Sequence, residues 1–211
     1  MDTPHALLYQ RYPALTVCRP AIDAAVTALI DGFSCGGKLL LCGNGGSCAD
    51  CDHIAGELMK GFLEKRPLPP ETRARMREAC PALTEETLTK LQQGLPAIPL
   101  AGMAGLFTAF CNDVDPKLTF AQSVLALGQP GDMLLGISTS GNAENVLAAA
   151  RVARARGLTV LALTGKTGGA LKAEADIAVC VPETETYRVQ ELHLPVYHAL
   201  CSAVEAHFFA G

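Results

Sequence analysis

Two apolar runs in this chain each end in a turn that is rich in glycine and hydroxyl side chains. Residues 39–47 have the sequence LLLCGNGGS, and residues 134–142 have the sequence LLGISTSGN. Each turn precedes a segment of helical character, so strand, turn and helix follow one another as in an α/β fold. Backbone N–H groups at such a turn bind anions well. Two of these turns in one domain predict a phosphorylated ligand.

The remaining apolar runs are short, rich in β-forming residues and separated by helical stretches. Their near-continuous apolar character, with little alternation, is typical of a parallel sheet covered on both faces. The chain has 211 residues and 49% hydrophobic content, which fit one domain with a well-buried core. We therefore expect a single α/β domain over residues 1–211, with a doubly wound, flavodoxin-like, five-stranded parallel sheet at 38–42, 97–101, 132–138, 158–164 and 177–181.

Helices are predicted before, between and after these strands. Two N-terminal helices, at roughly 4–12 and 20–34, precede the sheet, and a long helix at roughly 186–209 closes the chain. Residues 143–156 have apolar side chains at helical spacing, and Gly157 is a typical helix stop. Flanking helices of this kind often make subunit contacts, so we expect a homo-oligomer.

Residues 63–96 depart from this compact pattern, because they are rich in charge and proline. The sequence Pro69-Pro70-Glu71 predicts one helix start, and Thr84-Glu85-Glu86 predicts another with Thr84 as its N-cap. We interpret the segment as a helical insertion. A solvated or interface element and a lid over the substrate site are both open roles.

Composition excludes several classes of protein. The formal net charge is −4, and residues 73–77 hold the one short cluster of Arg, so no nucleic-acid footprint is present. We find neither an uninterrupted apolar run long enough for a bilayer nor an N-terminal signal pattern, and we expect a cytoplasmic protein without membrane association. Nine cysteines, an odd number, indicate reduced thiols. Cys48 and Cys51 form a lone C-x-x-C, which is more typical of helix packing than of a metal site.

Five motifs taken together resemble one known family. They are Gly43-Asn44-Gly45-Gly46-Ser47; then Asp50, His53 and Glu57; residues 136–142; Leu163-Thr164-Gly165; and residues 188–193. This set resembles the SIS (sugar isomerase) domain family, and within it the phosphoheptose isomerases. The resemblance covers nearly the whole chain except residues 63–96. It implies the SIS fold and tetramers whose active sites lie between subunits.

The resemblance also implies roles for individual residues. Glu57 and His198 match the catalytic base and acid, and the positions of His53, Glu57, Gln190 and His198 match those that bind a zinc ion. The residues that match substrate-binding positions are Asn44, Gly45, Gly46, Ser47, Asn112, Asp113, Ser138, Thr139, Ser140 and Gln190. No nucleotide cofactor is implied.

Chemistry argued from the residues points the same way. His53 and Glu57 are four residues apart on a predicted helix, so their side chains share one face. An aldose–ketose isomerase needs a base to move a proton between neighbouring carbons and a second group for the oxygens of the enediol. The same carboxylate and imidazole groups can act with a catalytic zinc ion or without one.

Three departures from the family pattern affect the predicted site. Ala143 stands where close members commonly have another phosphate-contacting serine. Gly61 stands where they tend to have an arginine, for which Lys60 or Arg188 is a candidate replacement. Pro195 lies between Gln190 and His198 and removes a helical hydrogen bond, so a kink is predicted there.

We therefore expect a phosphosugar isomerase that interconverts sedoheptulose 7-phosphate and D-glycero-D-manno-heptose 7-phosphate. One alternative is a non-catalytic SIS sensor or adaptor that binds a sugar phosphate, of the type that assists a replication initiator. Those adaptors lack the glutamate and the distal histidine, which are both present here. A phosphosugar lyase or etherase shares the phosphate turns and is a third possibility.

Overall fold

A five-stranded parallel sheet forms the centre of the computed structural model, which describes residues 6–210. The strand order is β2-β1-β3-β4-β5, and all neighbouring pairs are parallel. Each strand lies within two residues of the expected run, so the doubly wound, flavodoxin-like fold is confirmed. The strands are β1 (Leu39–Gly43), β2 (Ala97–Pro99), β3 (Met133–Ser138), β4 (Thr159–Thr164) and β5 (Ile177–Cys180).

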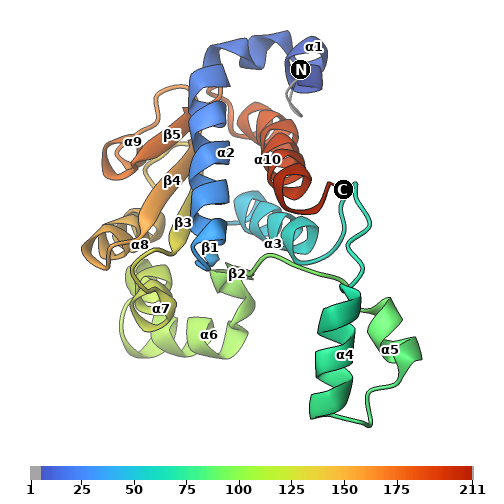
Figure 1. The fold of residues 1–211 in the computed structure, drawn as a ribbon. Helices are drawn as coiled ribbons and strands as arrows, with labels where there is room; N and C mark the ends of the chain where they lie inside the picture. Colours follow the sequence, from blue (N-terminus) through green and yellow to red (C-terminus); the bar gives the residue numbers. More distant parts are fainter. Residues whose placement is uncertain (1–5, 211) are drawn as a thin grey trace.

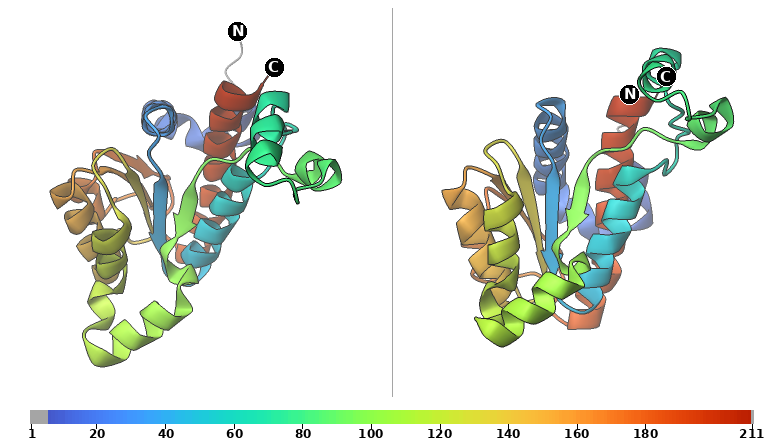
Figure 2. Two further views of the ribbon diagram at one scale, coloured as in Figure 1. Left: turned by 60° about the horizontal axis from the view of Figure 1, so that its bottom comes forward. Right: turned by 90° about the horizontal axis from the view of Figure 1, so that it is seen from below.

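Helices cover both faces of the sheet and bury it (Figure 2). Side chains of β1 alternate between two cores. Leu39 and Leu41 pack with α2 (Arg19–Ser34), α3 (Gly46–Met59) and α10 (Thr186–Phe209). Leu40 and Cys42 pack with α7 (Thr119–Leu127), α8 (Glu144–Ala155) and α9 (Leu171–Glu174). This burial on both faces explains why the strands are apolar without alternation. It also places α3 and α10 on the same face, where they contact each other.

The expected helices are present, except that residues 4–5 of the first one lie outside the described residues; α6, α7 and α9 were not anticipated. Gly157, with φ at +78°, lies just beyond α8, as the sequence predicted. Pro195 lies inside α10, which continues through it as one helix. The helices are α1 (Ala6–Arg11), α2 (Arg19–Ser34), α3 (Gly46–Met59), α4 (Pro70–Ala79), α5 (Glu85–Lys90), α6 (Ala104–Asp113), α7 (Thr119–Leu127), α8 (Glu144–Ala155), α9 (Leu171–Glu174) and α10 (Thr186–Phe209); the 3-10 turns are Pro13–Cys18, Leu100–Gly102 and Pro116–Leu118.

The N-terminal helical stretch Pro13–Ser34 has the length and the mean hydropathy, 1.3, of a membrane span. The sequence analysis did not anticipate this, because charged residues such as Asp23 interrupt the apolar run. One face of the stretch, including Ile22 and Leu29, is buried in the core, whereas other apolar side chains such as Val17 are exposed. Core helices of folded domains commonly have this composition, so the stretch is weak support for a span.

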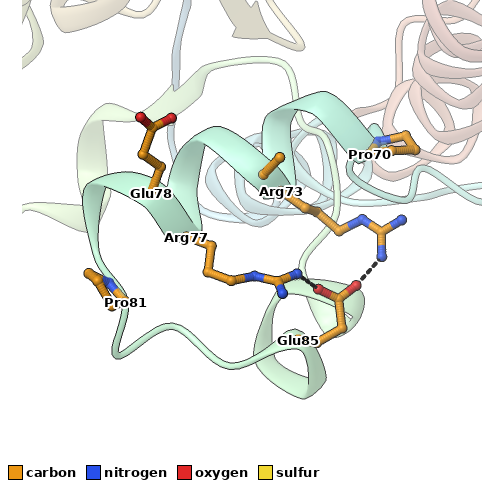
Figure 3. Close-up of a pocket in the computed structure, with 7 residues that line it drawn as sticks. Pro70, Arg73, Arg77, Glu78, Pro81 and Glu85 are labelled. Atoms are coloured by element: carbon orange, nitrogen blue, oxygen red, sulfur yellow. Dashed lines mark hydrogen bonds and ion pairs between the residues drawn. The ribbon is translucent and has the colours of Figure 1, made fainter.

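The insertion contains the two predicted helices and projects away from the sheet (Figure 1). Pro70 is the first residue of α4, and the Thr84 hydroxyl oxygen accepts a hydrogen bond from the Thr87 amide at the start of α5, as predicted. A pocket of about 620 Å³ lies between them. In this pocket Arg73 and Arg77 both pair with the Glu85 carboxylate (Figure 3). These ion pairs tie α4 to α5.

All nine cysteines lie within the described residues and are free thiols. Cys48 and Cys51 occupy the first turns of α3, as the sequence predicted, and Cys51 is buried. Burial raises the pKa of the Cys51 thiol well above its ordinary value, and neighbouring thiols and carboxylates raise it further. The buried thiol therefore stays protonated and packs as a small apolar side chain.

His193 on α10 makes the stability of the fold depend on pH. Its side chain is fully buried, and burial lowers its pKa to about 4, against a weaker opposing effect of the Thr164 backbone. Between its unfolded pKa of about 6.5 and pH 4, the unfolded chain binds a proton that the folded chain does not. We expect the free energy of unfolding to fall by about 2–3 kcal/mol from pH 7 to pH 4.5 through this residue.

Urea denaturation of wild type and a His193→Gln variant at both pH values measures this effect. On acidification from pH 7 to pH 4.5, the free energy of unfolding of His193→Gln should fall by about 2–3 kcal/mol less than that of the wild type. A His207→Gln variant is the matched control, because His207 is exposed. Equal losses in wild type and His193→Gln would rule out the buried imidazole as the cause.

Candidate active site

The two glycine turns lie side by side at the carboxyl-terminal ends of the strands. β1 and β3 are neighbours in register, with Gly43 opposite Ile137, so the turns that follow them emerge together. This is the point where the strand order reverses, between β1 and β3. In open α/β sheets ligands bind in the crevice at this position.

The first turn leads directly into α3. Gly45, with φ at +56°, precedes the helix, and Gly46 is its first residue. A Cβ atom at Gly46 would lie 2.4 Å from Gln190 Nε2, so the residue must be glycine for the Gln190 amide to rest on the turn. Ser47 is buried, and its amide donates to the Asn44 carbonyl. At this turn the backbone is therefore closely approached by one polar side chain from a distant segment, that of Gln190.

The second turn is held by its own side chains. Ser138 is buried at the end of β3, and the Ser140 hydroxyl oxygen accepts a hydrogen bond from the Asn142 amide at 3.1 Å. Asn142 Oδ1 in turn accepts from the Ala170 amide at 3.0 Å. Ser140 keeps its hydroxyl proton for a ligand, and Thr139 is only partly buried. These hydroxyls suit an anion that is held without lysine or arginine.

A pair of asparagines joins the first turn to the start of α8, the helix that follows the second turn. Asn44 and Asn145, in the first turn of α8, exchange two hydrogen bonds of 2.9 Å through their side-chain amides. Asn145 was missed by the sequence analysis, because nothing in its local sequence indicates a partner 101 residues away. Asn112 and Asp113 end α6, are exposed and bond to each other at 2.8 Å; between residues 6 and 210 no hydrogen bond connects them to the turns.

The predicted acid–base residues meet where α3 and α10 pack together. His53 Nε2 lies 3.2 Å from Glu57 Oε1 on α3, as their spacing predicted. His198 reaches across from α10, with its Nε2 atom 3.4 Å from His53 Nε2. Lys60 Nζ lies 3.3 Å from the other Glu57 oxygen, so this lysine contacts the cluster from the end of α3. Burial lowers the pKa of His198, aided by His53 and opposed by Glu57.

A phenol and a second carboxylate complete this cluster. The Tyr197 hydroxyl donates to Asp50 Oδ1 at 3.2 Å and lies 3.0 Å from His53 Nδ1. Burial raises the pKa of Asp50, although the Tyr197 hydrogen bond and the nearby His53 oppose this. The sequence analysis gave Asp50 no role, although it lies three residues before His53 on one helix. It missed Tyr197 altogether.

Three of the four predicted metal ligands come together within one chain. Two ligands of a tetrahedral zinc ion, each about 2.05 Å from the metal, lie about 3.3 Å apart. The spacings of His53 to Glu57 and to His198 match this value. Gln190 lies instead at Gly46, seven residues before His53 on α3. Among the described residues no group of three or more His, Cys, Asp or Glu side chains is arranged so that it could hold a metal ion.

A cavity of about 470 Å³ opens beside this cluster. His198 and Pro195 of α10 line one side, Phe62 and Leu63 another, and Tyr12 and the end of α1 close it. The Phe62 and His198 rings lie 5.5 Å apart. The cavity gives His198 access to the outside of the chain.

Comparisons with known proteins show which family this chain resembles over most of its length. The SIS domain family model matches residues 105–209. A phosphoheptose isomerase from Roseiflexus sp. is 40% identical over 190 residues, which are 90% of this chain and 83% of the relative. One from Trichlorobacter lovleyi is 40% identical over 97% of this chain and 90% of the relative.

Solved structures give the same result. The structure of a phosphoheptose isomerase from Francisella tularensis superposes with a TM-score of 0.75 at 32% identity, over 93% of this chain and 91% of that one. The enzyme from Neisseria gonorrhoeae gives a TM-score of 0.73 at 32% identity, over 93% and 92%. The resemblance seen in the glycine turns is thereby confirmed, and the chain belongs to the phosphoheptose isomerase family of SIS domain proteins.

Proposed function

We propose that this protein is an aldose–ketose isomerase that interconverts sedoheptulose 7-phosphate and D-glycero-D-manno-heptose 7-phosphate. The observation that supports this most directly is the meeting of Glu57 and His198 with His53 at the α3–α10 contact. The relatives are named for this activity. Non-catalytic adaptors of the family lack the residues that match Glu57 and His198, both of which contact His53 here. The enzyme is therefore favoured over the adaptor.

The spacing of the two parts of the site suits a seven-carbon substrate. Ser47 and His53 are six residues apart on α3, which corresponds to about 9 Å along the helix axis. An extended chain advances about 1.2 Å per bond, so the seven bonds from the carbonyl carbon C2 to the phosphorus atom span about 8 Å. A phosphate at the glycine turns then leaves the reacting carbons near His53 and Glu57.

The reaction needs two proton transfers at carbon, from C1 and to C2, and the movement of a proton from the oxygen on C1 to the oxygen on C2. The Glu57 carboxylate removes a proton from C1 of the ketose, and an enediol forms as the C2 carbonyl becomes a hydroxyl. His198 moves protons between the oxygens on C1 and C2, and Glu57 returns its proton to C2 to give the aldose. Burial and the nearby His53 lower the pKa of His198, which favours a neutral imidazole at pH 7.

The proposal includes a zinc ion held by His53, Glu57 and His198, with Gln190 as the fourth residue that the family resemblance implies. When bound, such an ion would polarise the substrate carbonyl. The histidine and glutamate spacings given above support it. The same residues bind and orient the sugar oxygens whether or not the ion is present.

Assembly and location complete the proposal. We expect a homotetramer, as the resemblance implies, and a cytoplasmic location, as the sequence analysis expected. Apolar side chains beside the His198 cavity support self-association, because Leu7, Leu63 and Leu194 are 58%, 70% and 41% exposed.

A deuterium-exchange assay tests the proposed reaction. Purified protein is incubated with sedoheptulose 7-phosphate in deuterated water, with and without added zinc, and followed by NMR. We expect an aldose phosphate and deuterium on the carbon beside the carbonyl, with the reaction faster than for fructose 6-phosphate or ribulose 5-phosphate. No exchange with the heptulose under either condition would refute the proposal. Preference for a shorter sugar would refute the seven-carbon assignment alone.

A further inference from the structure

The Tyr197 hydroxyl lies between two groups that both compete for its single proton. Tyr197 is 2% exposed on α10, and its oxygen lies 3.2 Å from Asp50 Oδ1 and 3.0 Å from His53 Nδ1. A carboxylate can only accept hydrogen bonds, so the phenol proton goes to Asp50. The second Asp50 oxygen is buried and has no hydrogen-bond partner in the part of the chain that the structure describes. Tyr197 is thus the side-chain donor on which this carboxylate depends.

This assignment decides where His53 holds its own proton. Because the phenol proton points to Asp50, the Tyr197 oxygen faces His53 with a lone pair. A contact of 3.0 Å between that oxygen and Nδ1 is then a hydrogen bond only if Nδ1 is the donor. A neutral imidazole has one N–H, so Nε2 of His53 is unprotonated.

The unprotonated Nε2 faces the centre of the candidate site. It lies 3.2 Å from Glu57 Oε1 and 3.4 Å from His198 Nε2. A lone pair opposite a carboxylate is repulsive unless a positive charge or an N–H lies between them. His198 Nε2–H can supply that hydrogen in the metal-free protein, and a divalent cation can replace it.

We propose that Asp50 and Tyr197 form a positioning relay that fixes His53 as the Nδ1–H tautomer, so that its Nε2 lone pair is held toward Glu57 and His198. The relay deepens the proposed function, because it prepares the same three side chains to receive zinc. Asp50 and Tyr197 themselves act only through His53. Contacts from α3 and α10 at two levels, Asp50 to Tyr197 and His53 to His198, also fix how the two helices pack.

The tautomer can be measured directly in the full-length chain. The protein contains five histidines, so selective nitrogen-15 labelling gives few signals, and a His53→Gln variant assigns the one of interest. Long-range proton–nitrogen spectra of the chelator-treated protein at pH 8 distinguish a protonated Nδ1 from a protonated Nε2. We expect Nδ1–H for wild-type His53. Finding Nε2–H in the wild type would overturn the proposal without any variant.

Two variants then test the role of the phenol. Tyr197→Phe removes the acceptor of the His53 proton. Tyr9→Phe, which removes the hydroxyl of a half-buried tyrosine on α1, is the matched control. We expect Tyr197→Phe to shift His53 toward Nε2–H and to weaken zinc binding about 10- to 100-fold, the range for loss of a partner that orients a metal ligand. The control should keep the wild-type tautomer and affinity.

The outcomes separate the relay from the isomerase assignment. The relay would be refuted if the Tyr197→Phe variant kept the Nδ1–H tautomer of His53 and bound zinc like the wild type. That result would leave the isomerase assignment intact, because the wild-type protein could still turn over the heptulose. Conversely, absence of turnover in wild type would refute the proposed function, while the tautomer measurement uses no substrate. If Tyr197→Phe does not fold, Asp50→Ala gives the same test, because without the carboxylate the phenol proton is free to turn toward His53.

Discussion

Replacing Glu57 by glutamine is expected to lower kcat for the heptulose about 10³-fold, with little effect on the fold. The amide keeps the shape of the side chain but cannot remove a proton from carbon, and a positioned general base contributes about 10²- to 10⁴-fold. The side chain is 13% exposed and contacts His53 and Lys60, so its neighbours can remain in place. Initial rates and deuterium incorporation measure the loss, and circular dichroism checks the fold.

A Glu86→Gln variant is the control for this experiment. Glu86 lies on α5 in the insertion, where its side chain is 78% exposed and pairs with Lys90. It should turn over the substrate like the wild type. Normal turnover by Glu57→Gln would refute the assignment of Glu57 as the base.

Replacing Glu205 by glutamine is expected to destabilise the protein by about 3–5 kcal/mol. Glu205 and Arg66 form an ion pair at 2.8 Å, and both side chains are at most 1% exposed. The Glu205 carboxylate also accepts backbone hydrogen bonds from Phe62 and Leu63. Removing one charge leaves the other buried without a counter-charge, which is much more costly than losing an exposed pair.

The pair also affects the candidate site. Arg66 donates to the backbone carbonyls of Leu58 and Glu57, so it holds the last turn of α3. Burial raises the pKa of Glu205, but its bonds from Phe62, Leu63, Arg66 and Glu64 outweigh this and lower it overall. The carboxylate is therefore ionised at neutral pH, as the expected effect requires.

Guanidinium denaturation at pH 7 measures the change in the free energy of unfolding. The Glu86→Gln variant serves again as the control, because an exposed pair four residues apart on a helix contributes only about 0.3–0.5 kcal/mol. A cost below 1 kcal/mol for Glu205→Gln would contradict the buried, charged state of this pair.

Local sequence was sufficient for most of the secondary structure. The apolar runs became strands because both of their faces are buried, and Thr84 and Pro70 began helices because capping and φ preferences act within a few residues. His53 and Glu57 face each other for the same reason, since a spacing of four residues on a helix fixes their relation.

The insertion shows the limit of this local information. Its helices were predicted with their start residues, but the sequence left open whether the segment is an interface element or a lid. In the structure α4 and α5 project from the sheet and are joined by ion pairs to Glu85. Their position relative to the rest of the chain follows from the loops at either end, which have no periodic pattern.

The sequence by itself predicted the strand order, most of the helices, the glycine turns and the candidate acid–base residues. Only the tertiary structure decided that Tyr197 joins Asp50 to His53 across 144 to 147 residues of chain, that Asn44 pairs with Asn145, and that Gln190 rests on Gly46. The physical reason is that caps, turns and helical faces depend on neighbours within a few residues. Hydrogen bonds between distant side chains exist only after the core has packed α3 against α10 and β1 beside β3.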